Sequence, residues 1–325
     1  MRTNCAIQTA PTLPASTLGR LLLSIGLFTF LAVLPTAADA ITLPTFSLGR
    51  NDSVNVAGVC WHTDYEYARR EAKAAKKMLL VNFVADGGSD YQRSFEKYLH
   101  ENESIRKQLG DYVLVRVPEN ERPGILRRGV LRKSRGRLLD NPAYKYMTKT
   151  PGVAIVDFKH ANQDFSGRVV TALPFKNGKY YRWTNSQLAA ALDLPAGTIT
   201  QRTMVWAVRI HPERPHSTEG KMHAELAEGA RKQSAYQASI GVQGHHHWET
   251  RVHHLVSSTR AHGASEVVAE SWPNQGMIDS CIDCVQSWRH SPGHWSAVSG
   301  THRYYGYDIR QGGNGIWYGT GIFAN

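Results

Sequence analysis

Cysteine is scarce in this chain, with four Cys among 325 residues, at positions 5, 60, 281 and 284. A framework of several disulfide bonds, which holds many small exported proteins together, is therefore excluded. No second Cys pair accompanies Cys281 and Cys284, so a zinc ribbon is excluded as well. The His-Glu-x-x-His motif of zinc hydrolases does not occur, and no Ser-His-Asp or Cys-His order stands out. Any metal or catalytic site must therefore be assembled from residues far apart in the sequence.

Long hydrophobic runs are also rare. The clearest is the stretch 21–34, which follows Arg2 and Arg20 and precedes the small-residue pattern Ala38-Asp39-Ala40. It is shorter than the roughly 20 apolar residues that a membrane-spanning helix needs. This order predicts a signal peptide over residues 1–40, and hence a secreted or periplasmic protein, with an uncleaved N-terminal membrane anchor as the alternative. No other segment is apolar enough to cross a bilayer, so we expect no membrane span in the mature chain.

Acidic residues are outnumbered, since 27 Asp and Glu stand against 38 Lys and Arg, for a formal net charge of +11. Such a charge favours an acidic partner, for example an anionic surface, a wall polymer or nucleic acid. Residues 122–137 concentrate the basic character, because they hold many Arg and no Asp or Glu. This segment is either a solvated insertion loop or an anion-binding arm. Because it lacks aromatic residues, base stacking is poorly supported, and the segment argues against a nucleic-acid partner.

Hydrophobic patterning in the first half alternates between helix and strand. Residues 65–77 are rich in helix-forming and charged residues. The run 78–85 is apolar, with β-branched and aromatic members, which predicts a buried strand. The predicted fold class is α/β, in the order α-β-α-β-α-β-β-α. The remaining predicted helices cover 94–109, 141–150 and 184–192, and the remaining strands cover 111–117, 151–158 and 167–173.

This order, together with two local motifs, resembles the thioredoxin-like fold over residues 58–196. The stretch LLVNFVADGGSDYQRSFEKYL resembles the family's strand, active-site turn and long helix, and TKTPGVAIVD resembles its Thr-Pro strand start. The resemblance implies a cis peptide bond before Pro151. The family's two cysteines would fall near Gly88 and Tyr91, where this chain has no thiol. Because thiol–disulfide exchange requires a thiolate, we expect a redox-inactive module that serves as a scaffold.

Composition changes near the middle of the chain. Residues 193–220 contain three Pro and scattered turn residues, and 12 of the 15 His follow residue 210. We therefore expect a linker over 197–219 and a second domain over 220–325. In that domain the pattern predicts helices and strands whose glycine turn, RQGGNG, supplies the positive φ that a hairpin needs. The helices cover 221–241 and 277–291, one strand covers 264–273, and the hairpin covers 304–324.

Four landmarks of the second domain resemble, in order, the CAP superfamily of cysteine-rich secretory, antigen 5 and pathogenesis-related 1 proteins. They are the histidines of GHHHW, the strand Glu of AES, the Ser-Pro-Gly-His step after a helix ending in Trp, and the hairpin ending WYGTGIFA. The resemblance implies an α-β-α sandwich with a cleft that collects two His and acidic residues. It assigns His294, Glu270 and one of the histidines 245–247, of which His245 is favoured because it directly follows Gly244. The further Glu that some members carry three residues after the helix Trp is absent here.

The residues assigned to the cleft suggest a chemistry. His245, Glu270 and His294 could hold Zn²⁺ or another divalent cation, with water as a fourth ligand. Such a site could bind a ligand, or hydrolyse a bond with Glu270 as metal ligand or general base. Trp295, next to His294, either packs in the core, as we expect of most Trp in this half, or lines the mouth of the cleft and packs on a ring-shaped ligand such as a sugar.

The pair Cys281 and Cys284 allows three interpretations. Export favours a local disulfide bond, a position at the start of a helix would favour a redox-active pair, and two thiols one helical turn apart could simply be packed.

The absence of catalytic residues favours a binding protein over an enzyme. The first domain lacks active-site thiols, and the second lacks one of the acidic residues that the resemblance implies for the cleft. We expect an exported binding protein that recognises a lipid, a sterol, a cell-wall polymer or another small ligand in the cleft. The alternatives are a metal-dependent hydrolase at the same cleft and a thiol oxidoreductase that uses Cys281 and Cys284.

Overall fold

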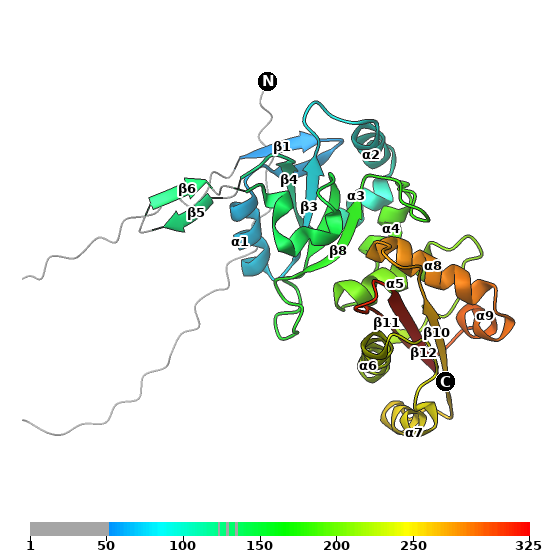
Figure 1. Cartoon of the computed structure of the whole chain (residues 1–325). Helices are drawn as coiled ribbons and strands as arrows, with labels where there is room; N and C mark the ends of the chain where they lie inside the picture. The colour runs from blue at the N-terminus through cyan, green and yellow to red at the C-terminus, as the bar shows by residue number, and fades with distance from the viewer. Residues whose placement is uncertain (1–51, 123, 128–129, 134–135) are drawn as a thin grey trace, which may run out of the picture.

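The structure is a computed structural model that describes residues 52–122, 124–127, 130–133 and 136–325. It is an α/β protein with two mixed sheets, of six and four strands, each packed with helices (Figure 1). The predicted signal peptide, residues 1–40, lies outside the described residues. Within the described ranges, no helix is both long and apolar enough to cross a membrane.

The first sheet has the strand order β1-β2-β4-β3-β7-β8. Strand β3 runs parallel to β4 and antiparallel to β7, so the sheet is mixed. Strands β1 and β2 are additions to the predicted order, and β1 lies before residue 58, where the predicted domain begins. The strands are β1 (Ser53–Val56), β2 (Val59–His62), β3 (Met78–Val84), β4 (Tyr112–Pro118), β7 (Gly152–Val156) and β8 (Val169–Pro174).

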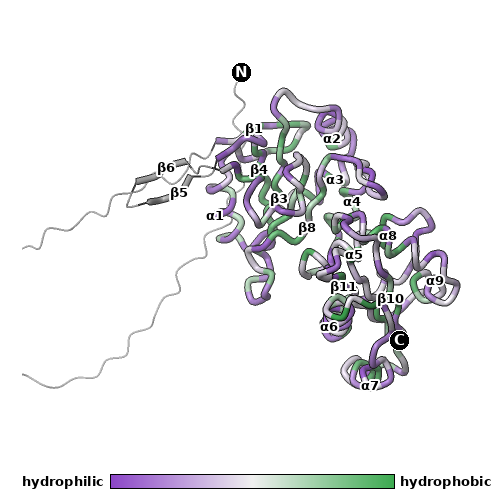
Figure 2. The backbone as a smooth tube through the Cα atoms, viewed as in Figure 1, coloured by the Kyte–Doolittle hydropathy of each residue, from purple (hydrophilic) through white to green (hydrophobic). Residues whose placement is uncertain are grey.

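Both faces of this sheet are buried, which explains the nearly continuous apolar run of β3. Leu79 and Val81 belong to the cluster shared with helix α1 and the 3₁₀ helices η1 and η2. Leu80 belongs to the opposite cluster, with α2, α3 and α4. Figure 2 shows the hydrophobic strands enclosed by more hydrophilic helices. The helices are α1 (Tyr65–Ala75), α2 (Asp90–Glu101), α3 (Glu103–Leu109), η1 (Leu138–Asp140), η2 (Pro142–Met147) and α4 (Gln187–Leu192).

The helix predicted over 94–109 is two helices, α2 and α3. Asn102 interrupts the run in an extended conformation, and its side chain accepts a hydrogen bond from the backbone N–H of Ile105 at 3.2 Å. A short amide side chain that satisfies an N-terminal N–H starts a new helix. The sequence contained this signal, but the helix-forming residues around it concealed the break.

The cis bond predicted at Pro151 is wrong, since the described residues contain no cis peptide bond. A trans bond is favoured for X-Pro by roughly 0.5–1 kcal/mol unless the surroundings oppose it. Here the next residue, Gly152, adopts φ 149°, and a Cβ atom at that position would lie 2.4 Å from the carbonyl oxygen of Leu173. At this strand start Gly152 adopts the unusual backbone conformation, which glycine tolerates, and the peptide bond before Pro151 is trans.

The basic segment 122–137 contains a hairpin within its described residues. Strand β5 (Gly124–Arg127) pairs antiparallel with β6 (Val130–Lys133), and the two form a separate sheet. Figure 1 shows this hairpin beside the first sheet, near α1. The segment is therefore an arm with strand structure in its described part.

The segment predicted as a linker, 197–219, contains helix α5 (Ile199–Arg209). Thr198 and Gln201 form a capping box at its start. Every residue from Thr200 to Val208 is buried, because α5 packs on β8 of the first sheet, on β11 of the second sheet and on α8. The linker prediction is therefore wrong for this helix. The prolines that suggested a linker lie before and after α5, and the helix joins the two sheets through one continuous hydrophobic cluster.

The second sheet has the order β10-β12-β11-β9. Strands β11 and β12 form the predicted hairpin, and β10 pairs antiparallel with β12 as the edge strand. Helices α6 and α7 cover one face, and α5, α8 and α9 cover the other. Gly306 in β11 permits close packing, since a Cβ there would lie 2.2 Å from the backbone of α6. The strands are β9 (Lys221–Met222), β10 (Ala264–Glu270), β11 (Tyr304–Gln311) and β12 (Trp317–Ala324).

Two helices of the second half escaped the sequence analysis. Helix α7 (Trp248–Thr259) begins directly after the His cluster, and α9 (Pro292–Ser299) occupies the Ser-Pro-Gly-His step. Pro292 stands at the first turn of α9, where its missing N–H costs nothing. The Ser-Pro-Gly-His step is therefore the start of a helix. The two predicted helices are present as α6 (Ala224–Ile240) and α8 (Met277–Arg289).

Candidate ligand-binding site

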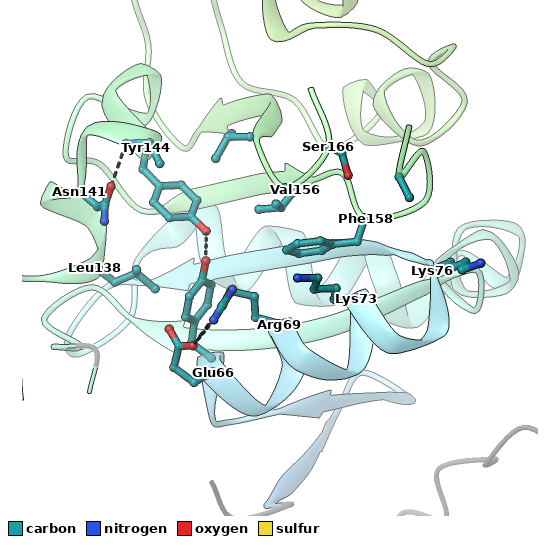
Figure 3. Close-up of a pocket in the computed structure, with 15 residues that line it drawn as sticks. Glu66, Arg69, Lys73, Lys76, Leu138, Asn141, Tyr144, Val156, Phe158 and Ser166 are labelled. Carbon is teal, nitrogen blue, oxygen red and sulfur yellow. Dashed lines mark hydrogen bonds and ion pairs between the residues drawn. The ribbon is translucent and has the colours of Figure 1, made fainter. Parts of the chain in front are cut away.

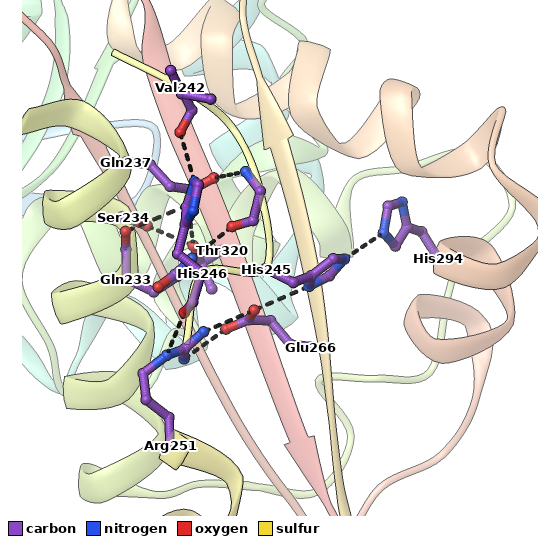
Figure 4. A network of polar contacts seen from close by, with 11 residues as sticks. Gln233, Ser234, Gln237, Val242, His245, His246, Arg251, Glu266, His294 and Thr320 are labelled. Carbon is purple, nitrogen blue, oxygen red and sulfur yellow. Dashed lines mark hydrogen bonds and ion pairs between the residues drawn. The ribbon is translucent and has the colours of Figure 1, made fainter. Parts of the chain in front are cut away.

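The structure brings His245 and His294 together at the β10 edge of the second sheet. Their Nε2 atoms lie 3.4 Å apart, and the two ring centroids are separated by 5.6 Å (Figure 4). His245 comes from the loop between α6 and α7, and His294 comes from the first turn of α9. The side chain of His245 is 44% exposed, so the pair lies at a surface that a ligand can reach.

The carboxylate that contacts this pair is Glu266, and not Glu270. Oε1 of Glu266 lies 3.0 Å from Nδ1 of His245, and Arg251 donates two further hydrogen bonds to the same carboxylate, at 2.8 and 3.0 Å. The Glu266 side chain is only 1% exposed. Both glutamates point to the same face of β10, but four residues of strand separate them by about 13 Å. Glu270 is exposed at the far end of the strand.

The hydrogen bonds of Glu266 fix the tautomer of His245. A carboxylate that faces a guanidinium can only accept, so Nδ1 of His245 must carry the proton and donate it. The lone pair is then left on Nε2, which is the atom that faces His294. His294 is also suited to the neutral form, because burial first and the neighbouring His245 second lower its pKa. Nε2 of His245 thus presents its lone pair to Nε2 of His294, which lies within hydrogen-bonding distance at 3.4 Å.

Two buried glutamines hold the loop that carries His245. Gln233 donates to the carbonyl oxygen of Gly244 at 2.6 Å, and the N–H of Gly244 donates to Gln237 at 3.1 Å. Gln237 in turn donates to Thr320 of β12 at 3.1 Å, so the loop is tied to the sheet. Because the backbone N–H and the carbonyl of Gly244 are both hydrogen-bonded, the backbone of the next residue, His245, is held in place. Figure 4 shows this network between α6, the loop and the strands.

The neighbouring histidines point elsewhere. Nε2 of His246 lies 3.2 Å from the carbonyl oxygen of Val242, and Nε2 of His247 lies 3.3 Å from the hydroxyl of Tyr236. Of the three histidines, His245 is thus the one that contacts His294. The backbone of His247 is left-handed, at φ 55°, which turns the chain into α7.

The distance within the pair fits a metal ion, but the predicted three-ligand set is not formed. Two zinc–nitrogen bonds of about 2.05 Å at a tetrahedral angle would place the nitrogens about 3.3 Å apart, close to the observed 3.4 Å. Within the described residues, however, no three His, Cys, Asp or Glu side chains converge so as to hold a metal ion. The assignment of Glu270 as a third ligand beside His245 and His294 is therefore wrong. Glu266 can serve only behind His245, as the group that orients its ring.

Trp295 packs away from the histidine pair. Its ring centroid lies 4.9 Å from that of His211 and 5.5 Å from the Arg289 guanidinium. Successive residues of a helix point about 100° apart, so His294 and Trp295 cannot face the same point. The predicted role of Trp295 at the mouth of the site has no contact to support it.

The predicted disulfide bond between Cys281 and Cys284 is wrong, because both thiols are free. Both residues lie in α8 and are 0% exposed. Burial raises the pKa of both thiols, that of Cys281 well above its usual range. Since α8 begins at Met277, neither thiol lies in the first turn, where the helix dipole would favour a thiolate. Of the three interpretations, packed thiols agree with this geometry.

The turn over residues 87–91, where the sequence resemblance expected an active site, caps a helix. Ser89 caps α2 by accepting a hydrogen bond from the N–H of Gln92 at 3.1 Å. Gly87 and Gly88 adopt positive φ, which is the left-handed turn that glycine favours. The segment 87–91 carries no sulfur, so it offers no thiolate for disulfide exchange.

Sequence reasoning missed Glu266, Arg251 and the two glutamines. One signal was available for Gln233 and Gln237, since they continue the buried stripe of α6 that begins at Leu226 with helical spacing. Buried polar side chains need hydrogen-bond partners, so Gln residues on the apolar face of a helix are expected to bind the backbone of a neighbouring segment. A comparison with known protein families finds no match for the chain, and a comparison with curated proteins finds no similar sequence.

Proposed function

We propose that the chain is an exported, non-catalytic binding protein that recognises its ligand at the His245–His294 pair. The observation that carries this proposal is the 3.4 Å approach of two imidazole nitrogens at a partly exposed surface, with one ring oriented by a buried carboxylate. Groups this well oriented favour selective binding, because little freedom is lost when a ligand arrives. The basic signal-like N-terminus over 1–40 supports export.

The fold resemblances support the division of labour in this proposal. The order β2-β4-β3-β7-β8, with its parallel and antiparallel pairs, is the arrangement expected of a thioredoxin-like module. The second sheet lies between helices on both faces, as expected of a CAP-type sandwich. By that resemblance the ligand is a lipid, a sterol, a cell-wall polymer or a related small molecule. The first half then serves as a scaffold.

A divalent cation such as Zn²⁺ is the cofactor that this donor set fits. His245 and His294 would hold it through Nε2, and Glu266 would keep His245 in the binding tautomer. A metal held by only two protein ligands leaves positions for a donor atom of the ligand. The bound ion would supply a positive charge and a directional contact for that atom.

The residues around the pair favour binding over the two enzymatic alternatives. A hydrolase needs a general base or a third metal ligand beside the reacting centre. Glu266 is engaged by Arg251, and Glu270 is distant along the strand. A thiol oxidoreductase needs an accessible thiolate, whereas Cys281 and Cys284 are fully buried with raised pKa values.

Zinc titration tests the site. Calorimetry on protein purified without a nickel column should show one bound Zn²⁺, and His294→Gln should weaken it at least about tenfold, since one of two ligands is lost. His253→Gln is the matched control, because His253 is an exposed histidine of α7 outside the pair. Equal zinc binding by wild type and His294→Gln would contradict the metal assignment.

The two glutamates give a second, sharper comparison. Glu266→Gln should weaken zinc about 10- to 100-fold, as expected when the carboxylate behind a metal-bound His is lost. Glu270→Gln should leave it unchanged.

Ligand recognition itself is measured with sterol-containing vesicles and with cell-wall polymer. Wild type should bind at least one of these, and His245→Gln should lose that binding. Binding to neither in the presence of zinc would refute the proposal.

A further inference from the structure

A cavity lies in the first half of the chain, on the α1 face of the first sheet. Its volume is about 720 Å³, within the range of small-molecule sites. Helix α1 forms one wall, and η1, η2 and the connection between β7 and β8 form the others (Figure 3). The cavity shares no residue with the His245–His294 pair, and it lies in the half to which the proposed function gives only a scaffold role.

The interior of this cavity is apolar. Leu138, Val156 and Phe158 line it, and each is nearly buried, at 3%, 4% and 8% exposure. An apolar surface of this kind favours contact with an aromatic or alkyl group over contact with water. Because the cavity is open, such a group could enter without a rearrangement of the sheet.

The rim of the cavity is cationic. Arg69 and Lys73 lie one turn apart on α1, and Lys76 follows as the left-handed C-cap at the end of the helix (Figure 3). The only carboxylate that lines the cavity is Glu66, and it already pairs with Arg69 at 2.9 Å. Among the described residues, no acidic side chain pairs with Lys73 or Lys76. Two positive charges are thus left to face the cavity mouth.

A pair of tyrosines adds a neutral donor. The hydroxyls of Tyr65 and Tyr144 lie 2.9 Å apart, and both line the cavity. Burial raises the pKa of both hydroxyls, so both stay protonated at neutral pH. Two O–H groups share one mutual hydrogen bond, so one proton is left over. Within the described part of the chain, no other side chain or backbone carbonyl accepts it, and an oxygen of a ligand could do so.

We infer that this cavity is a binding site for a small amphipathic anion, a carboxylate or phosphate carried on an apolar body. Lys73 and Lys76 take the anionic group, the spare tyrosine proton donates to one of its oxygens, and Phe158 with its neighbours packs against the body. Opposite charge at the rim and apolar surface inside select this class over neutral or purely polar molecules.

Three naphthalene probes test the site by calorimetry: 2-naphthoate, 2-naphthyl phosphate and the neutral 2-naphthamide. At least one of the two anions should bind about tenfold or more tightly than the amide, since about 1.4 kcal/mol corresponds to a factor of ten. The tighter of the two anions identifies the headgroup. Equal binding of the amide and both anions, or no binding of any probe, overturns the inference.

Variants locate the binding. The double change Lys73→Gln and Lys76→Gln should weaken the anions about tenfold and leave the amide unchanged, because only the charge is removed. Both lysines are exposed, so the fold should persist, and thermal melting checks this. Lys97→Gln, on α2, is the matched control for loss of one surface charge. Ala161→Trp should reduce binding of all three probes by filling the cavity. Unchanged anion binding in the double variant overturns the inference.

Discussion

Arg202 offers the most direct test of how the two halves are joined. It lies in α5, is 1% exposed, and has no carboxylate partner among the described residues. Its guanidinium is satisfied instead by oxygens of β8, of the last turn of α4 and of the segment after α4. These acceptors are the carbonyl oxygens of Val170 (3.2 Å), Ala191 (3.4 Å), Leu194 (3.0 Å) and Pro195 (2.7 Å), and the hydroxyl of Thr171 (3.1 Å).

The magnitude of a substitution follows from these contacts. Arg202→Leu would leave four carbonyls and one hydroxyl without this donor, at about 1 kcal/mol for each buried acceptor. The variant also avoids burying a cation, which offsets part of that loss. Burial lowers the pKa of Arg202 to about 10, so the residue is still charged at neutral pH. We expect a net loss of about 3 kcal/mol in the free energy of unfolding.

Urea unfolding followed by circular dichroism and by Trp fluorescence measures this loss. Arg202→Lys should lose about 2 kcal/mol, because an ammonium keeps the charge but cannot reach acceptors on two sides. Arg93→Gln is the control, since Arg93 is an exposed arginine of α2 and should change stability by less than about 0.5 kcal/mol. If Arg202→Leu were as stable as wild type, the hydrogen bonds would be no stronger than the cost of desolvating the cation, and the reasoning would be refuted.

Three further predictions concern Asp279, His294 and the two thiols of α8. Asp279→Ala should lose about 2 kcal/mol in the free energy of unfolding by urea, because Oδ1 accepts hydrogen bonds from two backbone N–H groups of the loop before α4, at 2.6 and 2.8 Å. Asp279→Asn keeps an acceptor and should lose less. Equal losses in the two variants would contradict this prediction. The pKa of His294 is lower in the folded protein than in the unfolded chain. As the pH falls below 6.5, the unfolded chain therefore takes up a proton first, and the free energy of unfolding decreases. His294→Gln should therefore show a shallower decline of melting temperature from pH 6.5 downward, and identical slopes would count against the assignment. The thiols of Cys281 and Cys284 should react with Ellman's reagent only after unfolding, and rapid reaction in the native protein would show that they are accessible.

Much of the architecture followed from hydrophobic patterning. The run 78–85 and the hairpin 304–324 were predicted because continuous apolar residues and a glycine turn are strong local signals. Helix α5 was missed because prolines outside it suggested a linker, and because a helix buried all round shows little amphipathic periodicity. Its place between the sheets depends on tertiary packing, which local propensity does not encode.

The candidate site shows a different limit. His245 and His294 could be paired from the sequence only through a family resemblance, since 49 residues separate them. The choice of Glu270 over Glu266 failed for a geometric reason. Both residues point to one face of β10, and only the position of the loop along the strand decides which of them meets His245. The alternation of side chains along a strand predicts which face of the sheet a residue points to, but it does not predict which residue on that face lies beside the loop.

Helix α5 has a consequence for how this protein could be divided or recombined. Tyr305, Tyr307 and Ile309 of β11 belong to the same apolar cluster as Met204 and Trp206 of α5. A fragment that starts at residue 220 would present those strand residues to water, and a fragment that stops at residue 196 would uncover the inner side of β8. The two halves are thus poor candidates for exchange as independent cassettes, and any split of the gene must keep this helix with both of its neighbours.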